Sequence, residues 1–124
     1  MKLSQKAFEE AVERAVSRLP EAIRSRMENI AIMVERRPSA DLLVEMGFGP
    51  DETLFGLYTG VPLPHRSATE PPLYPDEILI FREPLEEFCR DLQELEEEIE
   101  ITVAHEVAHF LGIDEERLAE LGYG

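Results

Sequence analysis

Apolar residues recur at helical spacing at the start of the chain and again in its last third. The first set predicts an amphipathic helix from about Ser4 to Arg18, with Ser4 as its N-cap. The second set continues at three-to-four spacing from Leu85 to Phe110. One helix of that length would be long for such a small domain, so we expect a break near residues 92–94.

Three segments between these helices have the composition of strands. Residues 29–36 are almost continuously apolar and rich in Ile and Val, which predicts a strand buried on both faces. Residues 53–59 and 77–82 are predicted to be the second and third strands. The stretch 60–76 between them carries five prolines and is predicted to be a long loop, a feature often associated with function.

Short helices are expected after Pro20, after Ser39 and after Asp114. The resulting order is α, β, α, β, loop, β, α, α. We therefore predict a single domain over residues 1–124 with an α+β fold, in which a small three- to four-stranded sheet packs on helices.

Composition and charge narrow the function. The chain has 124 residues, 44% of them hydrophobic, and a net charge of −15. Residues 41–124 carry the excess, with 21 acidic and 4 basic side chains. Nucleic acid is thus excluded as a substrate on electrostatic grounds, and a neutral or basic peptide is favoured. A solvated acidic face that serves solubility is the simpler interpretation of the same charge.

The absence of a membrane-length apolar run and of a signal-like start predicts a cytoplasmic protein without membrane contact. The single Cys89 fits a reducing compartment.

The run His105-Glu106-Val107-Ala108-His109 is the part of the sequence that indicates a chemistry. Two histidines four apart lie on one face of a helix, where both imidazoles can bind one Zn²⁺. Glu106 lies beside them, as a base that takes a proton from zinc-bound water. The spacing therefore predicts one zinc ion on the helix that contains this run.

A catalytic zinc site needs a third protein ligand and one open position. Gly112 allows the helix to end, and two carboxylates follow it, Asp114 and Glu115. By residue chemistry alone, either could be the third ligand.

The extended run His-Glu-Val-Ala-His-Phe-Leu-Gly-Ile-Asp-Glu resembles the H-E-x-x-H-x-x-G-x-x-(His/Asp) pattern of metzincin-type metallopeptidases. With a carboxylate at the last position, it is similar to the small bacterial minimal zincin family. Residues 56–63, 75–78, 80–82 and 112–118 extend the resemblance loosely over about residues 28–123. It implies a zincin-like fold with the H-E-x-x-H helix against one face of the sheet, and Glu115 as the third ligand.

Two departures from that family pattern bear on the site. The family usually has Asp at the last position, where this chain has Glu115. The chain also has no methionine after Glu115, so the methionine turn of metzincins has no counterpart.

The oxyanion of a zincin reaction needs a second electrophile, and the candidates are Tyr58, Arg66, His65 and Tyr123. Arg66 and His65 lie in the Pro-rich loop, which we expect to rim the cleft, although solvent-exposed loop residues are an equal interpretation. Tyr58 is expected in a strand. Cys89 could form a Cys-His-His metal site, but its place on an amphipathic helix favours a buried thiol.

The leading hypothesis is a zinc metallopeptidase that acts on a peptide or protein substrate. Zincin substrates extend a sheet at an edge strand, for which residues 53–59 and 77–82 are the candidates. The alternatives are a metal-stabilised interaction module without turnover, and a zinc hydrolase of a non-peptide amide. The sequence identifies neither the substrate nor the oligomeric state.

Overall fold

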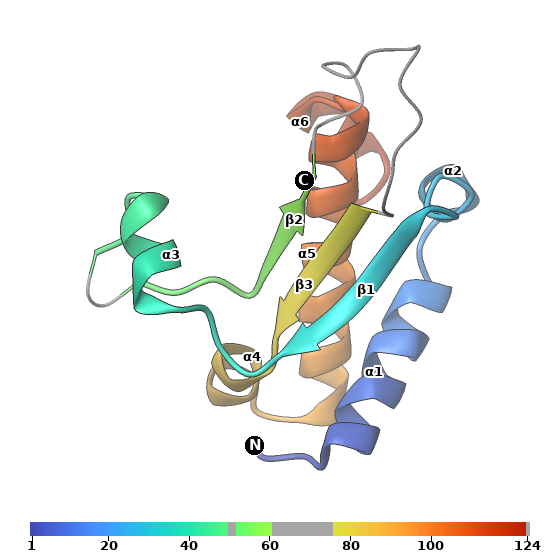
Figure 1. The fold of residues 1–124 in the computed structure, drawn as a ribbon. Helices are drawn as coiled ribbons and strands as arrows, with labels where there is room; N and C mark the ends of the chain where they lie inside the picture. Colours follow the sequence, from blue (N-terminus) through green and yellow to red (C-terminus); the bar gives the residue numbers. More distant parts are fainter. Residues whose placement is uncertain (50–51, 61–75, 124) are drawn as a thin grey trace.

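A computed structural model describes residues 1–49, 52–60 and 76–123 (Figure 1). Its strands are β1 (Ile30–Glu35), β2 (Gly56–Thr59) and β3 (Asp76–Phe81), and its helices are α1 (Gln5–Ser17), α2 (Glu21–Arg24), α3 (Ala40–Glu45), α4 (Arg82–Phe88), α5 (Leu92–Leu111) and α6 (Glu115–Glu120). The sheet has the order β1-β3-β2, with β1 parallel and β2 antiparallel to β3. The predicted α+β fold with a small sheet is confirmed.

Three helix starts follow directly from capping side chains. Ser4 Oγ accepts from the backbone NH of Ala7 at 3.1 Å, and Ser39 Oγ accepts from Leu42 at 3.1 Å. Asp114 Oδ1 accepts from Arg117 at 2.8 Å. Each cap satisfies a backbone donor that the first helical turn leaves without an intrahelical partner. The predicted starts of α1, α3 and α6 are thereby confirmed.

The expected break in the last helical region lies slightly earlier than predicted. Helix α4 ends at Phe88, and Asp91 caps α5 by accepting from the backbone NH of Glu94 at 2.8 Å. The sequence pattern missed this position because the apolar spacing continues across the break. The aspartate that competes for a backbone NH decides where the new helix begins.

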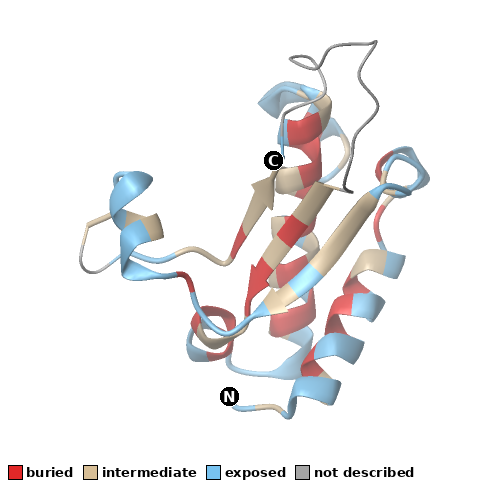
Figure 2. Ribbon diagram, in the orientation of Figure 1, coloured by how far each residue is buried: buried red, intermediate tan, exposed pale blue. Residues whose placement is uncertain are grey.

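The core lies between α1, α5 and one face of the sheet (Figure 2). Phe8 of α1, Ile99 and Val103 of α5, and Ile78 and Ile80 of β3 are all fully buried. Figure 1 shows α5 running behind the strands with α1 beside it, whereas α3 stands apart and has no buried residue. In the described part of the chain, no helix is long and apolar enough to cross a membrane.

The prediction that residues 29–36 form a strand buried on both faces is wrong. β1 is an edge strand, its residues are half-buried or exposed, and Met33 is 44% exposed. Among the described residues, β1 therefore has an unpaired edge and one uncovered face, because α5 and α1 pack against a single side of the sheet. β3 is the central strand, so residues 77–82 are not the edge that the sequence left as a candidate.

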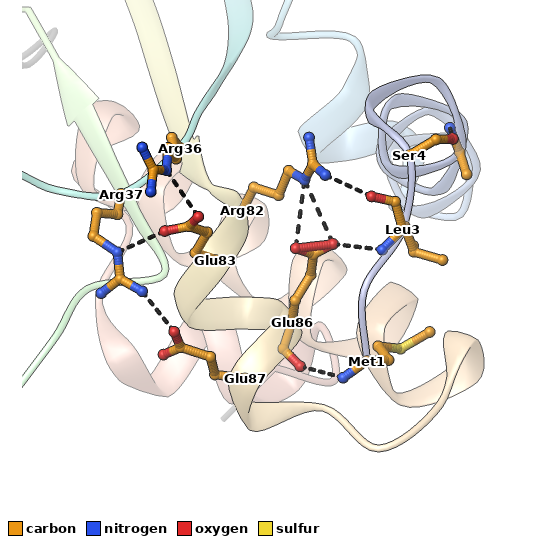
Figure 3. Close-up of polar contacts among 10 residues, drawn as sticks. Met1, Leu3, Ser4, Arg36, Arg37, Arg82, Glu83, Glu86 and Glu87 are labelled. Atoms are coloured by element: carbon orange, nitrogen blue, oxygen red, sulfur yellow. Dashed lines mark hydrogen bonds and ion pairs between the residues drawn. The ribbon is translucent and has the colours of Figure 1, made fainter.

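A buried carboxylate joins the start of the chain to α4 (Figure 3). Glu86 is 5% exposed and accepts from the backbone NH of Leu3 at 2.8 Å and from Arg82 Nε at 3.4 Å. Arg82 also donates to the Leu3 carbonyl at 2.5 Å. Because the charge is paired and hydrogen-bonded, its burial is tolerated.

A second carboxylate joins α4 to the end of β1. Glu83 accepts from Arg36 Nε at 2.8 Å and from Arg37 Nε at 2.8 Å (Figure 3). Hydrogen bonds from the two guanidinium groups lower the pKa of Glu83 from its ordinary 4.5 to about 2. In the folded protein, Glu83 therefore keeps its negative charge to a lower pH than it does in the unfolded chain.

Glu83→Gln tests the contribution of this pair to acid stability. A pKa depressed in the folded state adds stability above the ordinary pKa, and that contribution disappears as pH falls from about 4.5 toward 2. We expect the variant to be less stable than the parent at neutral pH and to lose less stability across that acid range. Thermal melts at a series of pH values measure the difference. If the melting temperatures of the two proteins fell by the same amount between pH 4.5 and 2, the lowered pKa of Glu83 would be contradicted.

Candidate metal centre

Helix α5 places the three residues of the H-E-x-x-H motif at the boundary between core and solvent. Val103, Ala104, Val107 and Ala108 face the core and are fully buried. His105 and Glu106 are half-buried, while the His109 side chain is 65% exposed. The core-facing stripe fixes the rotation of the helix, and with it the direction in which the two histidines project.

Glu106 is held between the sheet and a histidine. Its Oε1 accepts from the backbone NH of Tyr58 in β2 at 3.3 Å, and its Oε2 lies 3.5 Å from His109 Nδ1. Burial raises the pKa of Glu106, and His109 and the Tyr58 NH oppose that shift. A carboxylate with a raised pKa and 16% of its side chain exposed is suited to exchange protons with water.

A glycine allows β2 to approach α5 closely enough for this contact. A Cβ atom on Gly56 would lie 2.6 Å from Cγ2 of Thr102 in α5 and 3.0 Å from the carbonyl oxygen of Leu79. Any larger residue would therefore push the strand away from the helix. Two residues further along β2, Tyr58 meets Glu106 and stacks its ring on Phe110, with centroids 4.8 Å apart.

His105 has a partner that the sequence did not indicate. Its Nε2 lies 2.8 Å from the main-chain carbonyl oxygen of Tyr123. The Tyr123 hydroxyl in turn donates to Glu100 Oε2 at 2.7 Å, and burial followed by this hydrogen bond raises the pKa of the phenol. Nothing in the spacing of these residues could have predicted a contact made by a backbone atom.

The turn after α5 has the predicted geometry. Gly112 adopts φ 72°, a left-handed conformation that favours glycine, and the NH of Ile113 donates to the Ala108 carbonyl at 2.8 Å. Asp114 then caps α6 with its carboxylate, whereas Glu115 is exposed in the first turn of that helix. Of the two candidate ligands, Asp114 is thus committed to the backbone and Glu115 is the more available.

The donor set fits a zinc ion in its chemistry but is not fully assembled. Each imidazole has one ring nitrogen next to an oxygen acceptor, which leaves the other nitrogen for a metal. Among all described residues, however, no three side chains of His, Cys, Asp or Glu lie close enough together to hold an ion. The described fold therefore sets His109 beside Glu106 on α5, but it does not gather the two histidines and a third ligand around one ion position.

The other residues that the sequence offered as electrophiles or ligands lie in different surroundings. Arg66 and His65 lie outside the described residues. Tyr58 is in a strand, as predicted, and reaches Glu106 through its backbone NH, while the hydroxyl of Tyr123 is engaged by Glu100. Cys89 is buried in the core, and burial raises the pKa of its thiol to about 11, as expected for a structural cysteine.

A separate hollow of about 620 Å³ lies between α1 and β1. Val12 and Val16 of α1 and Ile32 of β1 line it, together with the charged Glu9 and Glu13. None of His105, Glu106 or His109 lines this hollow, so it has no part in the chemistry of the motif.

A comparison with protein-family models identifies the family of the chain. The model of the zincin-like metallopeptidase family matches residues 27–124, which include the whole sheet, α5 and α6. The chain belongs to the zincin-like metallopeptidase family. The resemblance noted in the H-E-x-x-H run is thereby confirmed, and the match begins after α1 and α2.

A solved structure is similar over nearly the same length as this zincin-like chain. It is a conserved hypothetical protein from Thermus thermophilus, with a TM-score of 0.55 and 24% sequence identity. The alignment covers 94% of this chain and 98% of that one. The likeness supports the fold alone. No curated protein matches the chain.

Proposed function

We propose that this protein is a zinc-dependent metallopeptidase that hydrolyses a peptide bond in a peptide or protein substrate. His105 and His109 of α5 hold the ion, Glu115 supplies the third donor, and Glu106 is the general base. Membership of the zincin-like metallopeptidase family supports a metallopeptidase. The surroundings of Glu106 support its role as the base.

The environment of Glu106 is the observation that carries the proposal. Glu83 and Glu96, which join elements of the fold, are each paired with a guanidinium group. Glu106 is instead half-buried beside two histidines and has a raised pKa. This is the placement that a proton acceptor and donor for hydrolysis needs.

Strand β2 supports a peptide as the substrate. Within the described residues β2 pairs with β3 alone, so its other edge is open to another strand. A peptide that extends the sheet there would run past Tyr58, whose NH already meets Glu106 at 3.3 Å. The scissile carbonyl would then lie within reach of the motif.

Each group of the proposed site then has its own role in the hydrolysis. A bound zinc ion would supply a Lewis acid that polarises the carbonyl and lowers the pKa of water. Glu106 removes the proton from the attacking water and delivers it to the leaving amine. The Tyr58 NH and His109 hold the carboxylate in place between these two transfers.

One observation favours a second candidate, a metal-stabilised interaction module without turnover. Glu115 is not gathered with the histidines among the described residues, and a site short of a third ligand would bind a metal without activating it. A zinc hydrolase of a non-peptide amide would use the same residues as the peptidase, so only a substrate screen separates those two.

Zinc content tests the site itself. The purified protein, expressed with zinc in the medium, should carry about one equivalent, as a catalytic zinc site requires. His105→Ala should reduce it to near zero, because two of three ligands cannot retain the ion. His65→Ala, a change at the histidine outside the motif, is the matched control and should keep its zinc. Metal-free parent protein would refute the zinc proposal.

Glu106→Gln separates catalysis from metal binding. The amide keeps the shape of the side chain and loses its ability to move a proton. Hydrolysis in a peptide library should therefore fall by at least about 100-fold. Zinc content and melting temperature should stay near those of the parent. Glu97→Gln, on the exposed side of the same helix, is the control. If both the parent and Glu106→Gln are inert on every peptide, the interaction module is the better description.

Two adjacent variants distinguish the candidate third ligands. Asp114→Ala removes the N-cap of α6 and should cost about 1 kcal/mol of folding stability with little change in zinc affinity. Glu115→Ala should lower zinc affinity and leave stability almost unchanged. Zinc titration and thermal melts on both proteins measure the two effects. The opposite pattern would assign Asp114 as the ligand.

A further inference from the structure

The outer edge of β1 presents backbone groups to a possible further strand. The NH of Asp76 donates to the Asn29 carbonyl at 3.1 Å, and in a parallel pair the main-chain groups of alternate residues face the neighbouring strand. Counted along β1 from Asn29, the NH and carbonyl groups of Ile32 and Val34 therefore point away from β3. Among the described strands, none pairs with this edge.

This edge lacks the features that usually protect an exposed strand. Residues 30–34 contain no proline, glycine or charged side chain, and the charge of β1 comes only at its end, with Glu35. An apolar edge of this kind is a template for pairing with another chain. Its outward backbone groups need an extended partner, because a helix uses its own NH and carbonyl groups internally. The edge therefore favours an added strand over a docked helix.

The hollow of about 620 Å³ between α1 and β1 follows this edge. Its β1 wall consists of the consecutive residues 32–34, whose side chains alternate between the two faces of the sheet, so the hollow lies beside the strand. The opposite wall is α1, which runs alongside β1 in the opposite direction (Figure 1) and contributes Val12 and Val16. A strand added at the edge would therefore have apolar side chains to pack on.

The rim of the hollow is acidic. Glu9 and Glu13 of α1 are both exposed there. Arg24, the basic residue of the lining, donates to Glu21 at 2.6 Å and to the Ser17 carbonyl at 3.0 Å. Its charge is thus balanced by Glu21, and the charges of Glu9 and Glu13 are left for a partner. An occupant with basic side chains fits this rim.

The spacing on α1 matches that of an extended chain. Glu9 and Glu13 are one helical turn apart, about 6 Å along the axis. Side chains on one face of a strand are two residues apart, about 6.6 Å. Two basic side chains of an added strand can therefore meet both glutamates. In the same way, two aliphatic side chains can lie on Val12 and Val16, which are also four residues apart.

We propose that the edge of β1 and the adjacent face of α1 bind an extended segment of a partner protein. The segment adds a strand beside β1, and its helix-facing side chains are aliphatic at one end and basic at the other. A second copy of this chain fits less well, because its net charge of −15 and its own acidic rim would be repelled. None of the H-E-x-x-H residues lines the hollow, so the proposal does not rest on the proposed function.

A synthetic peptide provides the probe. Acetyl-Thr-Val-Thr-Val-Thr-Lys-Thr-Lys-Thr-amide has both valines and both lysines on one face, and its reversed sequence is used beside it because a strand can add in either direction. In a ¹⁵N NMR titration to millimolar peptide, the backbone amide signals of Ile32 and Val34 should shift with one of the two peptides. The same peptides with glutamate in place of lysine should leave these signals unchanged.

Paired charge substitutions test the rim. Glu9→Gln combined with Glu13→Gln should weaken the binding of the lysine peptide about 3- to 10-fold, as expected for the loss of two exposed ion pairs. Glu10→Gln combined with Glu97→Gln is the matched control. It changes the net charge equally at exposed positions outside the hollow, so its affinity should stay within about twofold of the parent.

N-methylated peptides separate strand addition from attraction by charge alone. The NH groups of alternate residues in an added strand face its neighbour. One lysine peptide therefore carries N-methyl groups on its valines and lysines, and another carries them on the threonines between. One of the two should lose binding and the other should keep it. Equal affinities for both would contradict the added strand.

Three further results would overturn the proposal. The lysine peptides could leave Ile32 and Val34 unshifted, or shift the amide of Tyr58 instead, which would place binding at β2. Slow hydrogen exchange at the Ile32 and Val34 amides in a monomer would mean that the chain itself covers the edge. The same protection in a stable dimer would assign the edge to a second copy. None of these results changes the zinc content or the effect of Glu106→Gln, which test the proposed function separately.

Discussion

The burial of one face of α5 is the constraint on which the rest of the structure depends. Leu95, Ile99, Val103 and Val107 are fully enclosed by α1 and the sheet, so the helix cannot rotate without exposing them. His105, Glu106 and His109 occupy the margin of the same helix. Core packing therefore sets the side of the helix from which these three side chains project.

The carboxylate of the candidate site has different partners from the other shielded carboxylates of the protein. Glu86 and Glu96 are buried, and each is paired with arginine, while Glu83 lies between two arginines and its pKa falls to about 2. Glu106 receives a backbone NH and a histidine in place of a guanidinium group, and its pKa is raised. Glu83 is therefore held in the charged form by two guanidinium groups, whereas Glu106, with other partners, is left able to exchange a proton.

Local signals predicted much of the fold. Ser4, Ser39 and Asp114 cap helices where the sequence places them, and Gly112 ends α5 in a left-handed turn. These features depend on residues within one or two turns, so the sequence alone specifies them. The burial of β1 was predicted wrongly, because an apolar run does not tell a central strand from an edge strand covered on one face.

The sequence by itself determined the helix with two histidines and a glutamate, because helical spacing places residues four apart on one face. Only the tertiary structure decided what those side chains meet. The Tyr58 NH comes from a strand 48 residues before Glu106, and the Tyr123 carbonyl lies 18 residues after His105. In both contacts the partner of the α5 side chain is a backbone atom, so the identity of the partner residue does not reveal the contact. Side-chain identity therefore cannot encode them, and they arise only when packing brings the segments together.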